Sequence, residues 1–318
     1  MIILVSGSCG FIGIHLCQKL LELGHEVIGI DNFNDYYDPK IKYDRYNLIK
    51  NDVDVLNGNI EDEKIYSVLP RVDLIIHLAA QAGVRYSLIN PESYINSNIV
   101  GSFKLIDFAK KCECERFIYA SSASVYGKNK IPWNENMNLS EPISLYGATK
   151  ISLEAIADSY FEMFGLKSVG LRFFSVYGPW GRPDLSLWKW TEGILNDEPI
   201  KVFNYGKNKR SWTYIDDLIP GIISTMTSDG NIEKFNLGSD KLVDIDYSVD
   251  CISNYLGIKP KKEYEPMQDG DIVEANPDLT KSRKILGFEP QVDFEDGIKR
   301  FVDWFREYHD SYEKQIKI

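Results

Sequence analysis

The sequence is poor in cysteine and histidine, with five cysteines and four histidines in 318 residues. The cysteine number is odd and no Cys-x-x-Cys spacing occurs. Both features argue against a disulfide framework and against a zinc site, since each needs paired or clustered ligands. We therefore expect free thiols in a reducing compartment and no bound metal.

Long hydrophobic runs and excess positive charge are also missing. No apolar run approaches the roughly 20 residues that a membrane span requires, and the first residues lack the basic start of a signal peptide. The formal net charge of −11 disfavours nucleic acid and anionic membrane surfaces as partners. We expect a cytoplasmic, soluble protein. An anionic small substrate remains compatible with this net charge, because a local cluster of arginines can make the potential positive at the binding site.

The first half of the chain alternates apolar strands with amphipathic helices, in a composition typical of globular proteins. Buried strands separated by helices predict an α/β fold with a Rossmann-like, doubly wound parallel sheet. Such a sheet binds ligands at the carboxyl ends of its strands. The expected strands are Ile2–Ser6, Glu26–Ile30, Val72–Leu78, Arg116–Ala120 and Ser168–Phe173, and the expected helices are Phe11–Leu23, Ser97–Lys111 and Lys150–Phe164.

From about Tyr177 the elements become shorter and more irregular. Phe235–Leu237 predicts a strand that returns to the sheet, Pro260–Pro277 predicts loops, and Phe294–Tyr308 predicts a final amphipathic helix. We expect a first domain at residues 1–176, to which residues 212–239 return. A smaller, mixed α/β domain for the substrate is expected at residues 177–211 and 240–318.

A glycine-rich segment, Gly7-Ser8-Cys9-Gly10-Phe11-Ile12-Gly13, joins the first expected strand to the first expected helix. Glycines at this turn allow the backbone to approach a pyrophosphate, which then faces the helix N-terminus. Asp31 ends the second strand, where a carboxylate accepts hydrogen bonds from both ribose hydroxyls and repels a 2′-phosphate. The pattern predicts NAD as cofactor rather than NADP, with Asn32 beside the same ribose.

Tyr146 and Lys150 are one helical turn apart, so both side chains lie on one helix face. An ammonium close to a phenol lowers the tyrosine pKa and makes a base usable near neutral pH. Ser121 and Ser122 follow a strand, so their hydroxyls are expected at the same sheet edge. Ser122 is then placed to hydrogen-bond the substrate oxygen that Tyr146 deprotonates. The alternative is that the serines only pack a tight loop.

These motifs resemble the extended short-chain dehydrogenase/reductases, and specifically the NAD-dependent nucleotide-sugar epimerases. Four longer strings resemble the UDP-glucuronate 4-epimerases within that family: Asp31-Asn32-Phe33-Asn34-Asp35-Tyr36-Tyr37-Asp38-Pro39, Gln81-Ala82-Gly83-Val84-Arg85-Tyr86-Ser87, Gly178-Pro179-Trp180-Gly181-Arg182-Pro183-Asp184 and Pro266-Met267-Gln268. The resemblance covers nearly the whole chain. It implies a 4-epimerase that interconverts UDP-glucuronate and UDP-galacturonate, in nucleotide-sugar metabolism serving polysaccharide biosynthesis.

The resemblance also implies roles for individual residues. Tyr146 is the base for the 4-hydroxyl, Lys150 binds the nicotinamide ribose, and Ser122 bonds the 4-oxygen. The cofactor site is implied to comprise Gly7, Gly10, Phe11, Ile12, Gly13, Asp31, Asn32, Asn59, Ile60, Leu78, Ala79, Ala80, Gln81, Asn98, Ser121, Tyr146, Lys150 and Pro179. The first domain is thus an NAD-binding domain and the second a nucleotide-sugar-binding domain.

Two positions before Val125 separate the related sugar enzymes. Dehydratases carry Asp-Glu there and decarboxylases carry glutamate next to the valine, whereas this chain has Ala123 and Ser124. Without a carboxylate for elimination, epimerisation is the expected reaction. A 4-keto uronic acid is a β-keto acid that loses CO₂, so the enzyme must hold its carboxylate. Hydroxyl groups and arginines suited to that task are Ser122, Ser124, Ser175, Arg182 and Arg85.

The remaining implied substrate contacts concern the nucleotide. Arg210 matches the family's diphosphate-binding arginine, and Gln268 stands where many relatives have a second one. Val202, Tyr205 and Asp271 complete the implied substrate site. For Arg182, Arg85 and Arg210 a solvent-facing role stays open, and for Tyr205 a place in the core.

Four alternative functions also stay open: a 4-epimerase of UDP-glucose or UDP-N-acetylglucosamine, a decarboxylase, a dehydratase, and a non-catalytic NAD-sensing protein. The family further implies a homodimer formed through the helices expected at Ser97–Lys111 and Lys150–Phe164.

Overall fold

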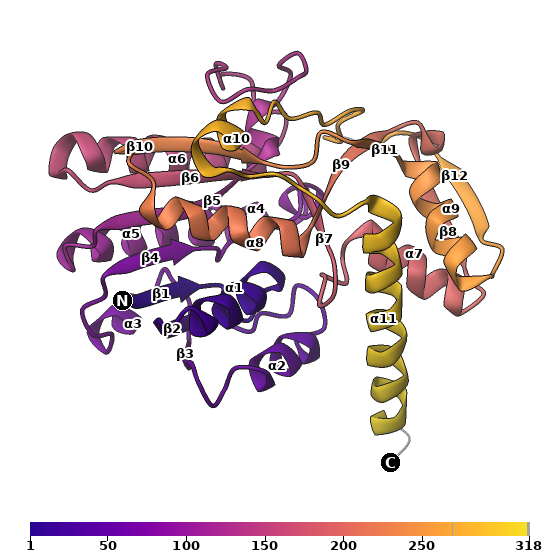
Figure 1. Ribbon diagram of the computed structural model, residues 1–318, viewed down its shortest axis with the longest axis horizontal. Coiled ribbons are helices and arrows are strands. Elements are labelled where there is room, and N and C mark those ends of the chain that lie inside the picture. The colour runs from indigo at the N-terminus through magenta and orange to yellow at the C-terminus, as the bar shows by residue number, and fades with distance from the viewer. Residues whose placement is uncertain (269, 317–318) are drawn as a thin grey trace.

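The computed structural model describes residues 1–268 and 270–316, with side chains through residue 310. Its centre is a seven-stranded sheet in the order β10-β6-β5-β4-β1-β2-β3, in which every pair of neighbours is parallel (Figure 1). The strands are β1 (Ile2–Ser6), β2 (Glu26–Asp31), β3 (Asp54–Asn57), β4 (Leu74–His77), β5 (Arg116–Ser122), β6 (Ser168–Phe173) and β10 (Ile232–Leu237). The expected Rossmann-like fold is confirmed, including the return of Phe235–Leu237 next to β6.

Helices cover both faces of this sheet, because the strands are apolar on both sides. In β1, Ile3 and Val5 join one buried cluster and Leu4 joins the other, as the two-residue period of a strand requires. The helices that follow or flank these strands are α1 (Phe11–Glu22), α2 (Lys40–Asn47), α3 (Glu63–Ser67), α4 (Pro91–Tyr94), α5 (Ser102–Lys111), α6 (Leu145–Phe164), α8 (Ile215–Ser224) and α10 (Thr280–Leu286).

A smaller part of the chain lies beside the carboxyl edge of the sheet (Figure 1). It contains a three-stranded sheet, β11-β9-β7, and a two-stranded sheet, β12-β8. Its elements are β7 (Ser175–Tyr177), α7 (Ser186–Leu195), β8 (Pro199–Phe203), β9 (Lys209–Tyr214), β11 (Leu242–Asp244), α9 (Ile245–Leu256), β12 (Lys261–Glu265) and α11 (Phe294–Ile316). Within the described residues, no helix is long and apolar enough to cross a membrane.

Three expected elements differ from the structure. The region Pro260–Pro277 was expected as loop but contains β12, whose lysine- and glutamate-rich sequence carries no apolar signal and which pairs with β8. The helix expected from Lys150 begins at Leu145, because the Ser144 hydroxyl caps it by accepting from the Gly147 amide at 3.0 Å. The helix expected at Ser97–Lys111 starts as a π-helix, η2 (Ile95–Gly101), and continues as α5.

Candidate active site

The proposed reacting side chains meet at the carboxyl edge of the large sheet. Ser122 is the last residue of β5, and Tyr146 and Lys150 occupy the first turns of α6, which packs on β5. Ser175 starts β7, which follows β6 after one residue, and Arg182 follows β7. Parallel strands bring their carboxyl ends to one edge, so residues distant in sequence share one site.

The glycine turn after β1 has the geometry of a phosphate cradle. Gly7 has φ +75°, and a Cβ there would lie 2.8 Å from the Ala79 amide nitrogen. Gly10 is the N-cap of α1 and offers no side chain to the amides of the first turn. Those amides, together with the helix dipole, favour an anion at this point. The turn also packs against the predicted cofactor segment Leu78–Gln81, so both lie at one place.

Asp31 is buried and tightly held at the end of β2. Its carboxylate accepts from the Cys9 amide at 3.1 Å and the Phe33 amide at 2.9 Å, and Lys42 Nζ lies 3.4 Å away. Beside it, the exposed Asn32 donates to the Asn59 side chain at 2.8 Å. Ile60, next in the chain, is buried and packs against Gly101 in η2. The predicted ribose residues therefore lie together on one side of the glycine turn.

Asn98 lies in the π-helix and joins the cofactor loop to the catalytic helix. Its Oδ1 accepts from the Gln81 amide at 2.8 Å, and its Nδ2 donates to the Gln81 carbonyl at 3.0 Å and to Thr149 Oγ1 at 3.1 Å. Thr149 in turn donates to the Tyr146 carbonyl at 2.8 Å. Because π-turns redirect side chains within a helix, the irregular turn places this amide where a regular helix would not.

Tyr146 and Lys150 lie close together, with Lys150 Nζ 5.9 Å from the centre of the Tyr146 ring. Lys150 is buried and donates to the Ala120 carbonyl at 2.8 Å, and burial lowers its pKa to about 8 against an opposing effect of Glu154. Burial raises the pKa of Tyr146, while a hydrogen bond with Ser122 and the charge of Arg182 lower it. Ser122 and Arg182 thus favour the phenolate of Tyr146, and the effect expected of Lys150 stays a prediction.

A buried ion pair, which sequence reasoning missed, joins α6 to the large sheet next to the proposed reacting side chains. Arg172 Nη2 and Glu154 Oε2 are 2.7 Å apart, and both side chains are buried. Ser121 donates to Glu154 Oε1 at 2.6 Å, and Arg172 Nη1 bonds the Tyr126 hydroxyl at 3.0 Å. The Ser121 hydroxyl thus faces this network, and Ser122, one residue later, faces Tyr146, as strand alternation requires.

Arg182 forms an ion pair with the carboxylate of Asp184. Its Nε donates to Asp184 Oδ1 at 2.9 Å and its Nη2 to Asp184 Oδ2 at 2.5 Å. The Tyr36 hydroxyl donates to the same Oδ2 at 3.3 Å. Tyr36 and Asp184 lie within two of the strings quoted above, but only the fold brings them together across 148 residues. The alternative that Arg182 faces solvent therefore does not hold, because its side chain is mostly buried and paired with Asp184.

The loop carrying Arg182 is fixed to the glycine turn through buried Arg45. Arg45 Nη1 donates to the Cys9 carbonyl at 3.2 Å, and its Nη2 donates to the carbonyls of Trp180 at 2.8 Å and Gly181 at 3.0 Å. His15 Nε2 donates to the carbonyl of Pro179, a predicted cofactor residue, at 2.9 Å. Sequence reasoning missed both Arg45 and His15.

A second group of charges surrounds Asp271. Arg210 Nη2 donates to Asp271 Oδ1 at 2.6 Å, and Arg85 Nη2 lies 4.0 Å from Asp271 Oδ2. The Arg85 guanidinium also lies 4.9 Å from the centre of the Phe203 ring. Nearby in sequence, the Gln268 Oε1 atom is buried without a hydrogen-bond partner. The structure thus brings Arg210, predicted at the diphosphate, together with Arg85, predicted at the carboxylate, and leaves one acceptor of Gln268 unsatisfied.

The other predicted substrate residues differ in exposure. Val202 is fully buried in β8, whereas Tyr205, with φ +52°, is 54% exposed, so it is no core aromatic. Ser124 and Ser175 are partly buried, and the Ser124 amide donates to Ser122 Oγ at 3.1 Å. Tyr205 therefore presents an accessible ring near the end of β8.

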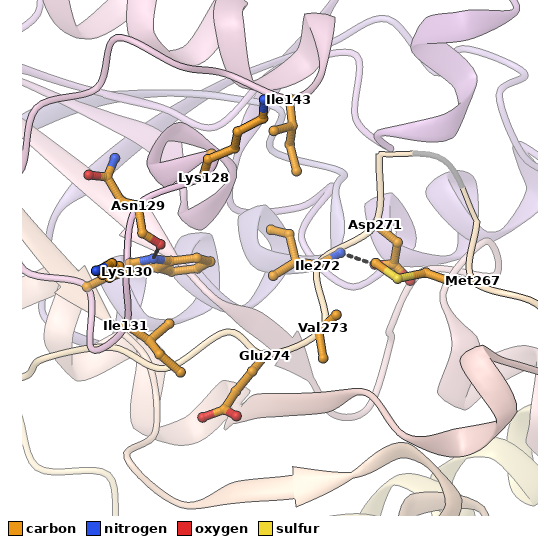
Figure 2. Close-up of a pocket in the computed structure, with 12 residues that line it drawn as sticks. Lys128, Asn129, Lys130, Ile131, Ile143, Met267, Asp271, Ile272, Val273 and Glu274 are labelled. Carbon is orange, nitrogen blue, oxygen red and sulfur yellow. Dashed lines mark hydrogen bonds between the residues drawn. The ribbon is translucent and has the colours of Figure 1, made fainter.

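An open cavity of about 580 Å³ adjoins this second group (Figure 2). Its walls are the segment from Gly127 to Ile131 with Trp133 and Ile143 on one side, and Met267 with residues 271–274 on the other. Asp271 lies at the boundary between this cavity and the arginines. Tyr146, Lys150 and Ser122 do not line it, so we place the chemistry at those side chains and not in this cavity.

Among residues 1–268 and 270–316, no three histidine, cysteine or acidic side chains gather as a metal site would require. The described cysteines are all free thiols. Burial and the charge of Asp31 raise the pKa of Cys9, which lies in the glycine turn, to about 12. This thiol is therefore a poor nucleophile near neutral pH.

Comparisons with known proteins identify the family of the chain. The family described as "NAD dependent epimerase/dehydratase family" matches residues 3–238. The chain is 38% identical over 340 residues to UDP-glucuronate 4-epimerase 1 of Arabidopsis thaliana, covering 99% of this chain and 79% of the relative.

Two solved structures are similar over 97% of this chain and 100% of their own. One is UDP-glucuronic acid 4-epimerase from Bacillus cereus in complex with UDP-glucuronic acid and NAD, at 30% identity and a TM-score of 0.92. The other is UDP-glucose 4-epimerase from Thermotoga maritima with UDP-glucose, at 31% identity and a TM-score of 0.88.

Proposed function

Because the chain belongs to the NAD-dependent epimerase/dehydratase family, we propose that it is a 4-epimerase that interconverts UDP-glucuronate and UDP-galacturonate. The reaction proceeds through a transient 4-keto sugar. The observation that carries this proposal is the grouping of Tyr146, Ser122 and Arg182, in which a base, its hydrogen-bond partner and a cation share one sheet edge. Epimerisation restores the cofactor in each cycle, so the reaction needs no external reductant.

The cofactor is NAD, which supplies reversible hydride acceptance when bound. The uncapped first turn of α1 and the close packing of Gly7 on Ala79 fit a pyrophosphate. Asp31 is proposed to hold the adenosine ribose, and Lys150 the nicotinamide ribose. The other predicted cofactor residues, Asn32, Asn59, Ile60 and the segment Leu78–Gln81, border the same cradle.

Tyr146 is proposed to remove the proton of the sugar 4-hydroxyl and later to return it. Ser122 bonds the same oxygen and, as its hydrogen bond lowers the Tyr146 pKa, stabilises the phenolate. Arg182, with Ser124 and Ser175, is proposed to hold the C6 carboxylate. Arg210 is proposed to bind the diphosphate. Arg85, the second candidate for the C6 carboxylate, lies beside Arg210 at Asp271, and Gln268 Oε1, buried and unsatisfied, accepts a donor of the substrate.

One observation favours a second candidate, a 4-epimerase of a neutral UDP-sugar. Arg182 is paired with Asp184, so its positive charge is already compensated. A neutral C6 hydroxymethyl group would need no free cation. The two candidates share all of the catalytic steps and differ only at C6.

The deciding experiment incubates the purified protein with UDP-glucuronate without added reductant and separates the products. Formation of UDP-galacturonate without CO₂ or UDP-pentose supports the uronate epimerase. An unchanged uronate, with UDP-glucose or UDP-N-acetylglucosamine epimerised in a parallel reaction, would overturn it in favour of the second candidate.

We further propose that the protein is cytoplasmic and serves polysaccharide biosynthesis. NAD is proposed to bind the domain of residues 1–176 and 212–239, and the UDP-sugar the domain of residues 177–211 and 240–318.

We also propose a homodimer. Support for the dimer comes from an apolar surface on η2, α5 and α6. Its exposed members are Ile95, Val100, Phe103, Met163 and Phe164.

A further inference from the structure

The carboxylate of Asp184 leaves part of the Arg182 guanidinium available. A guanidinium has five N–H donors, and the pair with Asp184 uses Nε and one hydrogen of Nη2. Asp184 does not use either Nη1 hydrogen or the second Nη2 hydrogen. One Nη1 hydrogen and this second Nη2 hydrogen form the end-on edge of the guanidinium, which can bind another carboxylate bidentately. Asp184 therefore orients the guanidinium without occupying all of it.

Tyr36, from the loop after β2, holds the Asp184 carboxylate through the hydrogen bond from its hydroxyl. Its hydroxyl lies against Gly83, where a Cβ would be only 2.5 Å from the Tyr36 oxygen and where φ is +93°. The Tyr36 ring also packs on Tyr86, with 4.7 Å between the ring centres. Burial raises the pKa of Tyr36 to about 12, so its hydroxyl stays protonated and donates at neutral pH.

Asp184 remains ionised in this arrangement. Burial alone would raise its pKa, but the charge and hydrogen bonds of Arg182, together with the Tyr36 hydroxyl, lower it below its ordinary value. The charge of Arg182 in turn reaches Tyr146, whose pKa it lowers. The chain Tyr36–Asp184–Arg182 therefore ends within electrostatic range of the proposed base.

We propose that Asp184, held by Tyr36, is a positioning residue that directs the free edge of Arg182 to the C6 carboxylate and so decides between epimerisation and decarboxylation. This inference rests on the proposed function. In the 4-keto uronate the C5–C6 bond breaks only when it aligns with the carbonyl π-system. Its electron pair then forms the C4–C5 enolate, CO₂ leaves, and a solvent proton adds to C5. The product is a UDP-4-keto-pentose, and the cofactor stays reduced.

The test uses Asp184→Asn and Tyr36→Phe in the full-length, NAD-containing protein. Asparagine keeps the shape of the side chain but removes its charge, and phenylalanine removes only the hydroxyl. Matched controls are Asp35→Asn, an exposed aspartate next to Tyr36 in the loop after β2, and Tyr43→Phe, a tyrosine with 49% exposure. NAD content and thermal unfolding verify that each variant is folded.

Three quantities are measured with UDP-glucuronate: the rate of UDP-galacturonate formation, the KM, and the fraction of turnovers that release CO₂ or leave the cofactor reduced. We expect that fraction to rise about tenfold in Asp184→Asn and about threefold in Tyr36→Phe, the sizes expected for losing a charged and a weaker hydrogen bond. The controls stay at the wild-type value. A purely structural role would lower stability or rate without changing this partition.

The outcomes separate the two proposals. If the wild type does not epimerise UDP-glucuronate, the proposed function fails, and this inference fails with it. If the wild type epimerises it while both variants match their controls in KM and CO₂ fraction, only the positioning role is overturned. Should Asp184→Asn not fold, Tyr36→Phe alone decides, because it removes a single partly buried hydrogen bond and no charge.

Discussion

At the scale of single residues, the proposed base Tyr146 is influenced by neighbours that its sequence spacing does not indicate, Ser122 and Arg182. Tyr-x-x-x-Lys indicates that the lysine lowers the tyrosine pKa. In the structure, burial raises that pKa and the opposing effects come from Ser122 and Arg182. Lys150, whose own pKa burial lowers to about 8, is directed to the Ala120 carbonyl and the cofactor edge. Ser122, which is proposed to bond the substrate oxygen, therefore also lowers the pKa of the proposed base.

This tuning predicts the pH dependence of the reaction. Because the Tyr146 pKa lies above its ordinary value, kcat/KM should rise with pH as the phenolate forms. Ser122→Ala removes a hydrogen bond that favours the phenolate, so the inflection should move upward by about one pH unit, equivalent to about 1.4 kcal/mol. Below the inflection kcat/KM is proportional to the phenolate fraction, so profiles measured between about pH 6 and pH 10 should rise with pH and lie about tenfold lower in Ser122→Ala. Ser159→Ala, an exposed serine of α6, is the control, and a profile of Ser122→Ala that matches the wild type would contradict the assignment.

Replacing the base itself should have a larger effect. Tyr146→Phe is expected to fold and to retain NAD, because phenylalanine keeps the ring that packs on Tyr94 and removes only the hydroxyl. Turnover should fall by about a hundredfold or more, the usual worth of a positioned general base. Product formation and the NAD content of the purified variant are the two measurements. Substantial retained turnover would mean that another group takes the proton.

At the scale of elements, α6 is anchored to the sheet by a buried ion pair. Glu154 of α6 and Arg172 of β6 are joined by two hydrogen bonds, and Ser121 of β5 adds a third. Removing one partner of such a pair leaves an uncompensated buried charge. The pair therefore holds the helix that carries Tyr146 and Lys150 against the strand that carries Ser122.

Neutralising Glu154 should consequently destabilise the fold. Glu154→Gln is expected to lower the free energy of unfolding by about 3 kcal/mol, as measured by urea denaturation. Glu162→Gln, on an exposed part of the same helix, should change it by less than about 0.5 kcal/mol. Equal effects of the two substitutions would show that the ion pair does not anchor α6.

The elements also show how far sequence reasoning extends. Apolar strands such as Ile2–Ser6 and Ser168–Phe173 were predicted at their observed bounds, because burial on both faces leaves a continuous apolar run. Charged β12 was missed, since its signal comes from pairing with β8 and not from its own side chains. Similarly, the motifs indicated Arg182 but not Asp184 or Tyr36 as partners, because polar contacts between distant segments leave no periodic pattern.

At the scale of the whole molecule, η2, α5 and α6 expose several large apolar side chains. Phe103 is 43% exposed, and Met163 and Phe164 are 60% and 50% exposed. Phe103 and Phe164 both pack on Tyr160, which joins the two helices. Exposed apolar patches of this kind mark association sites.

The proposed dimer should dissociate when a charge enters this surface. Phe103→Glu is expected to weaken self-association by about a hundredfold or more, because a buried unpaired charge at an interface costs several kcal/mol. Light scattering after size-exclusion chromatography measures the molar mass. Ile285→Glu, at a 48% exposed position on α10, should leave the mass unchanged. A wild-type protein that is monomeric at micromolar concentration would contradict the dimer.

Arg45 gives the molecule a property that belongs to neither ligand site alone. One guanidinium bonds the carbonyl of Cys9 in the glycine turn and the carbonyls of Trp180 and Gly181 next to Arg182. With NAD at the glycine turn and the sugar beside Arg182, as proposed, ordering one backbone segment should order the other and so link the binding free energies of the two ligands. Linkage is reciprocal, so the factor by which the sugar tightens NAD binding must equal the factor by which NAD tightens sugar binding. The substrate would then contribute to the affinity with which the enzyme retains NAD during turnover.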